Sequence, residues 1–248
     1  MRCTPQSAAR AALILAVLAP AFIVAAQPVV ADLSALQARL TERYPQVQIL
    51  QVAPSPIAGL YEVFTGDSVA YADPNGDYLI VGQMMETATR RNLSSERVDA
   101  LLRVDTAGLP LDKTIRYSSG KGSRHVYVFS DPDCPFCKQL EKDLATLDDV
   151  TVHILLYPLA SLHPDAVARA RAIWCSSDRA EAWSAWMLRG QDATSKDDCG
   201  SDPVDEILKI GRELRIASTP TLVFANGQRF TGAPPRDQLT ALLDAAQK

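Results

Sequence analysis

Apolar and polar residues follow two different patterns along the chain and predict two folded units. The first unit begins with Leu33, Leu36 and Leu40 at helical spacing. Short strand-like runs follow over residues 47–52, 61–64, 69–71 and 78–81. Residues 73–77 form a turn signal before the last run, and Gly76 suits the positive φ that such a turn requires. These features predict one helix and a small antiparallel sheet.

The second unit follows a predicted linker helix over residues 94–104, with Ser94 or Ser95 at its start. Glycine-containing breaks at 108–110 and 120–123 precede a long apolar strand over residues 125–130. The remaining pattern predicts, in order, a helix, a strand over 150–157, helices over 165–174, 179–188 and 204–214, strands over 221–224 and 229–231, and a closing helix.

Cys134-Pro135-Phe136-Cys137 stands directly after the strand over residues 125–130, where the next predicted helix starts. A cysteine at a helix N-cap faces unpaired backbone N–H groups and the positive end of the helix dipole, which stabilise a thiolate. Pro135 suits the first helical position. Cys137 lies one turn later, so we expect Cys134 to attack a disulfide and Cys137 to resolve the mixed disulfide.

Two other interpretations of the CxxC motif are a structural disulfide and half of a zinc site. A zinc site needs four ligands, and the remaining candidates do not include a second closely spaced pair. They are His125, His153, His163, Cys175 and Cys199. We therefore expect neither a metal nor another cofactor.

The first residues have the features of a secretory signal peptide. Two arginines precede an apolar stretch over residues 11–26, and no acidic residue occurs before Asp32. We expect cleavage after Ala26 or Ala31. A membrane anchor is the alternative, although the stretch is short and Pro20 interrupts it. Export to an oxidising compartment such as a bacterial periplasm is therefore expected.

The chain has five cysteines, and removal of the leader with Cys3 leaves an even number. We expect Cys175 and Cys199 to form a structural disulfide across a polar, charged segment, which would contribute about 3 kcal/mol by restricting the unfolded chain. The alternative is a second redox-active pair, for which a helix-start position is lacking. The net charge of −4 and the absence of a basic cluster argue against a nucleic-acid partner.

Several motifs together resemble the DsbC/DsbG family of periplasmic thiol:disulfide isomerases over nearly the whole mature chain. They are the 125–129 strand, the CxxC motif, Ala172-Ile173-Trp174-Cys175 with Cys199, Ser218-Thr219-Pro220-Thr221, and Asn226-Gly227. The resemblance implies an α/β thioredoxin-like catalytic domain with a helical insertion, preceded by a small α+β, cystatin-like dimerisation domain and a linker helix. The expected ranges are 1–31 for the signal peptide, 32–93 for the dimerisation domain, 94–113 for the linker helix and 114–248 for the catalytic domain.

The resemblance also implies roles and partners. Cys134 would be the attacking thiolate and Cys137 the resolving thiol, while Pro220 would be a cis-proline and Thr219 would offer backbone groups to a substrate. The protein would form a V-shaped homodimer, consistent with the unpaired edges of a small sheet. It would act on misfolded disulfide-containing exported proteins, show chaperone activity, and be reduced again by a DsbD-type membrane reductant.

Two departures limit what the resemblance implies. Pro135-Phe136 differs from the Gly-Tyr of the DsbC branch and is closer to the Pro-Tyr of the DsbG branch, so the preferred direction of exchange stays open. A DsbG-like reductase that rescues sulfenylated cysteines and a chaperone or binding module are the alternatives to an isomerase. Val128 occupies the position at which thioredoxin has a buried acid, and no successor to that acid is evident from the sequence.

Overall fold

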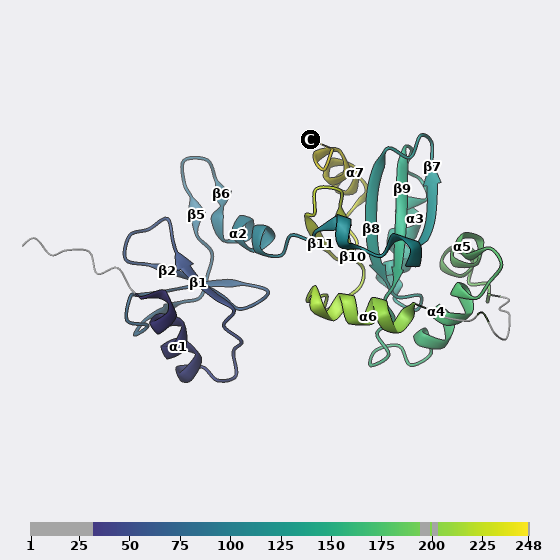
Figure 1. Cartoon of the computed structure of the whole chain (residues 1–248). Coiled ribbons are helices and arrows are strands. Elements are labelled where there is room, and N and C mark those ends of the chain that lie inside the picture. The colour runs from purple at the N-terminus through teal and green to yellow at the C-terminus, as the bar shows by residue number, and fades with distance from the viewer. Residues whose placement is uncertain (1–31, 194–198, 200–202, 248) are drawn as a thin grey trace, which may run out of the picture.

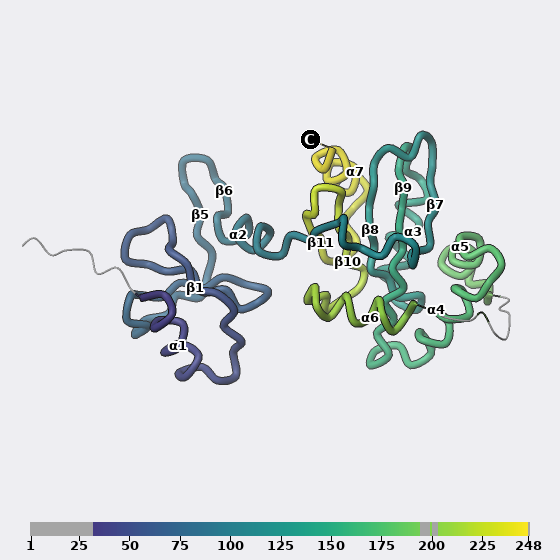
Figure 2. The backbone as a smooth tube through the Cα atoms, viewed as in Figure 1, coloured from purple at the N-terminus to yellow at the C-terminus, as the bar shows by residue number. Residues whose placement is uncertain are grey.

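A computed structural model describes residues 32–193, 199 and 203–247, so the predicted signal peptide lies outside the described residues. Figure 1 shows two units joined by the segment that follows helix α2, and Figure 2 traces the same path of the backbone. None of the helices in these described ranges is long and apolar enough to cross a membrane.

The first unit is a four-stranded antiparallel sheet between two helices. Its strands lie in the order β1-β2-β3-β4. The elements are α1 (Leu33–Arg43), β1 (Gln51–Pro54), β2 (Tyr61–Phe64), β3 (Val69–Ala72), β4 (Leu79–Ile80), the β5 (Met85–Glu86) and β6 (Arg91–Asn92) hairpin, and α2 (Leu93–Leu101).

Helix α1 packs on one face of this sheet because its apolar residues recur on one side. Leu36 and Leu40 are buried against Val63 and its neighbours. Asp32 caps the helix by accepting from the backbone N–H groups of its first turn. Gly76 lies in the predicted turn with a φ of 71°, and a Cβ there would come within 3.1 Å of the Leu36 side chain. The turn therefore closes tightly over α1 only with glycine at this position.

The second unit has a five-stranded mixed sheet in the order β11-β10-β8-β9-β7. Its elements are β7 (Ile115–Ser119), β8 (Arg124–Ser130), α3 (Pro135–Leu144), β9 (Val150–Leu156), α4 (Ala166–Trp174), α5 (Arg179–Arg189), α6 (Val204–Glu213), β10 (Thr221–Phe224), β11 (Arg229–Thr231) and α7 (Arg236–Ala245). Strands β8 and β9 are parallel, and β10 and β7 run antiparallel to them.

The central strand β8 is buried on both faces, which explains its continuous apolar run. Val126 and Val128 belong to a core cluster with residues of α3, α5 and α7. Tyr127 and Phe129 belong to a second cluster with residues of α6. Successive side chains of a strand point to opposite faces, so α3, α5 and α7 cover one side of the sheet and α6 covers the other.

Helix α6 approaches the sheet closely, and this contact positions the loop that leads into β10. A Cβ on Gly211 would lie 2.1 Å from a ring carbon of Tyr157, so only glycine permits the contact. The Tyr157 hydroxyl donates a 2.9 Å hydrogen bond to the backbone carbonyl of Ile216. Packing of α6 against the end of β9 therefore fixes where the chain begins its approach to Pro220.

The structure contains three short strands that the sequence pattern did not predict. Strand β7 pairs with β9 at the edge of the second sheet, where the prediction began with β8. Strands β5 and β6 are two residues each, which is too short to show the alternation of apolar and polar residues that identifies a strand in a sequence. Helix α2 begins with Asn92 as its cap and ends at Leu101. The rest of the predicted linker, through residue 113, holds two 3-10 turns instead of a continuous helix.

Helix α3 buries a carboxylic acid together with its apolar residues. Glu141 lies on the same face as Cys137, Leu140 and Leu144 and is 4% exposed. The Tyr117 hydroxyl, from β7, donates a 2.6 Å hydrogen bond to one carboxyl oxygen. Burial away from water raises the pKa of Glu141 to about 7, because the charged form is poorly solvated.

Glu141 is expected to make the second unit less stable as the pH rises. The folded-state pKa lies above the unfolded value, so the unfolded chain loses this proton first and stability falls between about pH 4.5 and pH 7. The loss amounts to up to about 3 kcal/mol at neutral pH. Glu141→Gln, which mimics the protonated acid, should therefore gain stability relative to wild type at pH 7.5 and show little difference at pH 4.5.

Urea unfolding followed by tryptophan fluorescence measures this effect in the relevant unit, because all three tryptophans lie on α4 or α5. Glu181→Gln is the matched control, since Glu181 is exposed on α5 and pairs with Arg189. Equal pH dependence in wild type and Glu141→Gln would contradict the assignment.

Candidate active site

The CxxC motif lies where the central strand passes into a helix. Strand β8 ends at Ser130, and Cys134 is the N-cap of α3 with Pro135 at its first turn, which confirms the predicted local structure. The first backbone hydrogen bond of the helix runs from the Lys138 N–H to the Cys134 carbonyl at 3.1 Å. The Phe136 side chain projects outward and is 65% exposed. The motif therefore presents one cysteine at the helix end and one inside it.

The two cysteines occupy different environments. Both are free thiols. Cys137 is fully buried, and its Sγ accepts a 3.4 Å hydrogen bond from the backbone N–H of Asp131. Cys134 is 5% exposed, and its Sγ lies 3.4 Å from the backbone carbonyl oxygen of Thr219. Only Cys134 borders the surface from which a substrate would approach.

This difference in environment separates the acidities of the thiols. A hydrogen bond from the Cys137 side chain, aided by the backbone N–H groups at the helix start, lowers the pKa of Cys134 to about 5. Burial raises the pKa of Cys137 far above its ordinary value, and the neighbouring Cys134 charge raises it further. At neutral pH the site therefore holds a thiolate at Cys134 and a protonated thiol at Cys137.

Thr219 and Pro220 lie beside Cys134, and the peptide bond between them is cis. Strand β10 follows them and pairs with β8, with Thr221 opposite Phe129. The Pro220 carbonyl accepts a 2.8 Å hydrogen bond from the Gly232 N–H. The structure thus brings together the two sequence segments that were expected to form the site, although they are 85 residues apart.

A buried carboxylate organises the turn before Cys134. Asp131 is fully buried, and its oxygens accept hydrogen bonds from the backbone N–H of Asp133 at 2.8 Å and of Leu159 at 2.7 Å. One oxygen also lies 2.9 Å from Nδ1 of His163. The backbone carbonyl of Asp131 accepts from the Cys134 N–H at 3.2 Å. Asp131 therefore ties the turn to the loop that follows β9.

The helical insertion contacts the same turn from α4 and α5. Arg169 donates a 2.7 Å hydrogen bond to the Asp133 carboxylate. The Trp186 indole N–H donates to the Pro132 carbonyl at 2.7 Å, and the Arg169 guanidinium lies 3.7 Å from the centre of the Trp186 ring. The structure thus places the Trp186 indole against the active-site turn.

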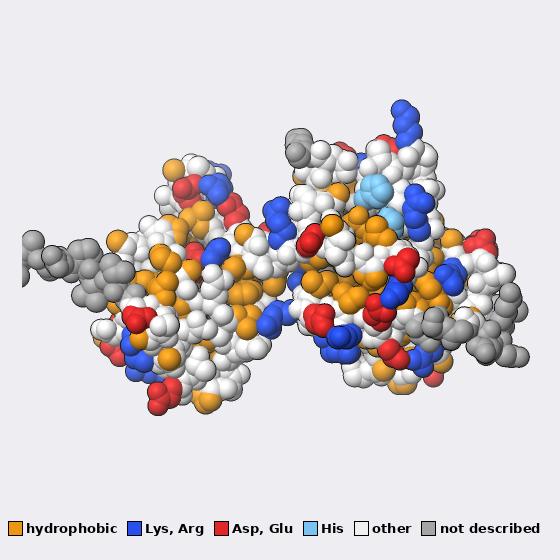
Figure 3. All heavy atoms as spheres, in the orientation of Figure 1, with side chains coloured by type: hydrophobic (Ala, Val, Ile, Leu, Met, Phe, Trp, Pro, Cys, Tyr) orange, Lys and Arg blue, Asp and Glu red, His pale blue; other side chains and the backbone are white. Residues whose placement is uncertain are grey.

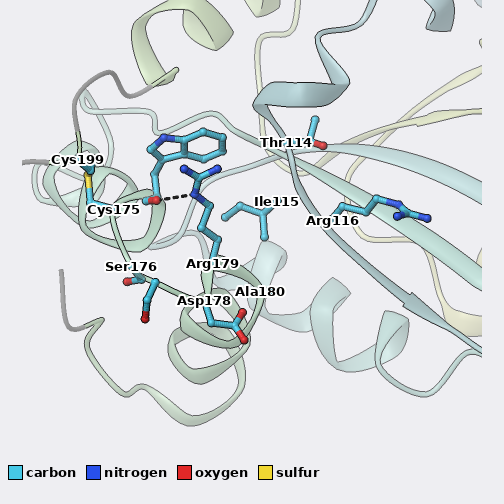
Figure 4. A pocket seen from close by; sticks show the side chains of 11 residues that line it. Thr114, Ile115, Arg116, Cys175, Ser176, Asp178, Arg179, Ala180 and Cys199 are labelled. Carbon is cyan, nitrogen blue, oxygen red and sulfur yellow. Dashed lines mark hydrogen bonds between the residues drawn. A yellow bond between two sulfur atoms is a disulfide. The ribbon is translucent and has the colours of Figure 1, made fainter. Parts of the chain in front are cut away.

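Cys175 and Cys199 are joined by a disulfide at the end of α4. Figure 4 shows this disulfide beside a cavity of about 760 Å³, with Arg179 donating a hydrogen bond to the Trp174 carbonyl. The residues that line the cavity do not include Cys134 or Cys137. The disulfide thus links two segments of the helical insertion, and it lies at a distance from the CxxC motif.

Comparison with protein families gives two matches that together cover most of the chain. Residues 26–95 match the disulfide bond isomerase protein N-terminal domain, and residues 111–247 match the thioredoxin-like domain. The probable thiol:disulfide interchange protein DsbC of Bordetella pertussis is 39% identical over 209 residues, which cover 84% of this chain and 73% of that protein. The chain belongs to the DsbC family.

Other DsbC-family comparisons agree. The thiol:disulfide interchange protein DsbC of Escherichia coli is 27% identical over 221 residues, covering 88% of this chain and 90% of that protein. The crystal structure of a disulfide interchange protein from Neisseria gonorrhoeae aligns with a TM-score of 0.54 and 43% identity, over 56% of this chain and 99% of that one. The predicted thioredoxin-like fold with its N-terminal domain is confirmed, and the protein is a thiol:disulfide interchange enzyme.

The roles of individual residues stay predictions, and so does the absence of a metal. Within the described parts of the chain, no three His, Cys, Asp or Glu residues cluster as metal ligands would. Sequence interpretation missed four residues around the CxxC motif, namely Asp131, His163, Arg169 and Trp186. Asp131 gave a weak signal, since it directly follows the apolar strand; the others reach the site from distant elements without a shared spacing.

Cys134 is expected to react with iodoacetamide in the folded, reduced protein, while Cys137 stays unmodified. The absorbance of the thiolate at 240 nm should rise with a midpoint near pH 5. Cys137→Ala removes the hydrogen bond that contributes most to this low pKa, so the midpoint should rise by about one unit or more. Cys134→Ser is the control that abolishes the signal. Modification of Cys137 before Cys134 would contradict the assignment.

Proposed function

We propose that this protein isomerises and reduces non-native disulfides of exported proteins, with Cys134 as the nucleophile. The observation that carries the proposal is the pairing of a stabilised thiolate at Cys134 with a buried, protonated thiol at Cys137, beside the loop of Thr219 and Pro220. A thiolate is the reactive form in disulfide exchange, and a low pKa makes Cys134 available at the pH at which exported proteins fold.

The exchange begins when the Cys134 thiolate attacks one sulfur of a non-native substrate disulfide. A bond forms between Cys134 Sγ and that sulfur, and the other substrate sulfur leaves as a thiolate. A substrate thiolate then attacks the sulfur bound to Cys134, which forms a new substrate disulfide and releases the Cys134 thiolate. The numbers of disulfides and thiols are unchanged, so this cycle needs no oxidant or reductant.

Cys137 releases the substrate from the mixed disulfide when the substrate does not rearrange. Burial raises the pKa of Cys137 most, and the charge of Cys134 raises it further. Once Cys134 is in a mixed disulfide that charge is gone, so the pKa of Cys137 falls. The Cys137 thiol can then ionise, attack Cys134 Sγ and release the substrate as a thiol. The enzyme is left with a Cys134–Cys137 disulfide. A DsbD-type membrane reductant would supply the two electrons that restore it.

Reactivation of a scrambled multi-disulfide protein tests this function. Reduced wild-type enzyme should restore activity in a buffer without added thiol, and Cys134→Ser should not. Cys137→Ala should retain some isomerisation through Cys134 but accumulate mixed disulfides with substrate, detectable as a heavier band on non-reducing gels.

Two outcomes would change the proposal. Reduction of sulfenylated cysteines without reactivation of the scrambled substrate would favour the reductase alternative. Aggregation suppression that persists in Cys134→Ser, with no reactivation by wild type, would favour a chaperone or binding module.

We also propose that the protein is a homodimer formed through the first unit, whose sheet has an exposed apolar edge. Strand β4 is the last strand of that sheet, and Ile80 is 52% and the adjacent Val81 82% exposed. Tyr78 before them is 76% exposed. Figure 3 shows hydrophobic side chains spread over the visible face of this unit, with charged groups among them. Pairing of two such edges would satisfy their backbone groups and bury their side chains.

Light scattering on the mature protein at micromolar concentration should return twice the mass of one chain. Val81→Lys places a charge on the β4 edge and is expected to shift the protein toward the monomer. Ile57→Lys is the matched control, because Ile57 is 50% exposed and follows β1 at the opposite edge of the sheet. A monomer mass for wild type would refute the dimer.

Periplasmic location and chaperone activity complete the proposal. The arginines and apolar stretch at residues 1–31 support export. Phe136 and Leu162, which are 65% and 68% exposed, flank the active-site turn and its partner loop. Apolar side chains exposed near a nucleophile fit unfolded chains, which present apolar segments of their own.

A further inference from the structure

The turn before the nucleophile carries two acidic residues. Asp131 and Asp133 lie three residues and one residue before Cys134, and Asp131 is fully buried. A negative charge close to a thiol opposes the formation of a thiolate. The turn therefore places two acidic side chains close to Cys134, and basic groups that pair with them would reduce their effect on the thiolate.

Each carboxylate has a basic partner outside the turn. Arg169 of α4 pairs with Asp133 at 2.7 Å. His163, in the loop after β9, pairs with Asp131 at 2.9 Å. The two pairs differ in one respect. The arginine is charged at every pH of interest, whereas histidine titrates near neutrality. Of these two pairs, only the His163 pair can change its charge between pH 5 and pH 8. Glu141, farther along α3, also titrates in this range.

We propose that the imidazolium of His163, held by Asp131, stabilises the Cys134 thiolate and so sustains thiol:disulfide exchange at acidic pH. The inference rests on the proposed role of Cys134 as the nucleophile. His163 acts here through Cys134 and is a positioning residue, since its contact in the structure is with Asp131 and not with the reacting sulfur.

The electrostatic surroundings of His163 favour its charged form. The hydrogen bond with Asp131 raises the pKa of His163, with smaller contributions in the same direction from the charges of Cys134 and Asp133. Two other basic residues lie around the same turn: Arg169 on α4 binds Asp133, and Lys138 on α3 lies over the Trp186 ring. Because the interaction is mutual, the His163 charge favours the thiolate as much as the thiolate favours the charge.

The two other histidines of the chain lie on strands β8 and β9, away from the active-site turn. His125 and His153 stack on each other on β8 and β9, with ring centres 5.7 Å apart. Burial lowers the pKa of His153 to about 4. Neither makes a hydrogen bond to the active-site turn among the described residues. His125, on β8, therefore offers a control substitution of the same kind away from the active-site turn.

The experiment measures the Cys134 thiolate by absorbance at 240 nm, and its alkylation rate by iodoacetamide, in the full-length mature protein. His163→Gln removes the charge and keeps a hydrogen-bonding side chain. It should raise the Cys134 pKa by about half a unit to one unit, and slow alkylation at pH 5 by about two- to fivefold. At pH 7.5, where Cys134 is ionised in both proteins, the rates should be nearly equal.

Three comparisons separate charge from structure. His163→Lys keeps a positive charge and should preserve the low pKa of Cys134. His125→Gln should leave the titration unchanged. In wild type, the imidazole signal of His163 observed by NMR should titrate at higher pH in the reduced protein than in the oxidised one, because oxidation removes the thiolate.

A Cys134 titration that is the same in His163→Gln as in His125→Gln would overturn the inference. So would an equal slowing of alkylation at pH 5 and pH 7.5, which indicates a misplaced helix. The measurement does not depend on isomerase activity. If wild type fails to reactivate scrambled substrate while His163→Gln still shifts the thiolate pKa, the isomerase proposal fails and the charge coupling stands.

Discussion

The hydrogen bond from the Cys137 thiol to the Cys134 thiolate is the interaction on which the rest of the site depends. Cys137 is buried inside α3 and retains its proton, so it serves as the donor that stabilises Cys134 as a thiolate. This arrangement requires the helix to start at Cys134 and its first turn to lie against β8. The apolar face of α3, with Leu140 and Leu144 fully buried, holds it there and contributes about 2 kcal/mol for each leucine.

The helical insertion is part of the active site as well as an addition to the fold. Through Arg169 and Trp186 it holds the side chain of Asp133 and the carbonyl of Pro132. The loop before it brings His163 to Asp131. The Cys175–Cys199 disulfide lies at the end of α4, so this covalent link restrains the helix that carries Arg169.

Local features were predictable from the sequence, and contacts between distant segments were not. The strand, turn and helix around Cys134 follow from residues that are neighbours in the chain. The predicted position of Cys134 as the N-cap of that helix is confirmed. The pairing of Asp131 with His163 joins positions 32 residues apart, and that of Trp186 with Pro132 joins positions 54 residues apart. No repeating pattern in the sequence connects the two members of either pair. Strand β7 did leave a signal, since its burial alternates from Ile115, but its short length and the glycines after it masked the pattern.

The contact of Gly211 with Tyr157 has a consequence for how such a site is mapped by mutation. Alanine scanning assumes that each substitution removes atoms, but at Gly211 alanine adds one, 2.1 Å from the Tyr157 ring. The added methyl group would push α6 away from β9, and the displacement would pass through the Tyr157 hydroxyl and Ile216 to the loop beside Cys134. A residue with no side chain thereby helps to position the loop beside Cys134, and its importance appears only when volume is gained.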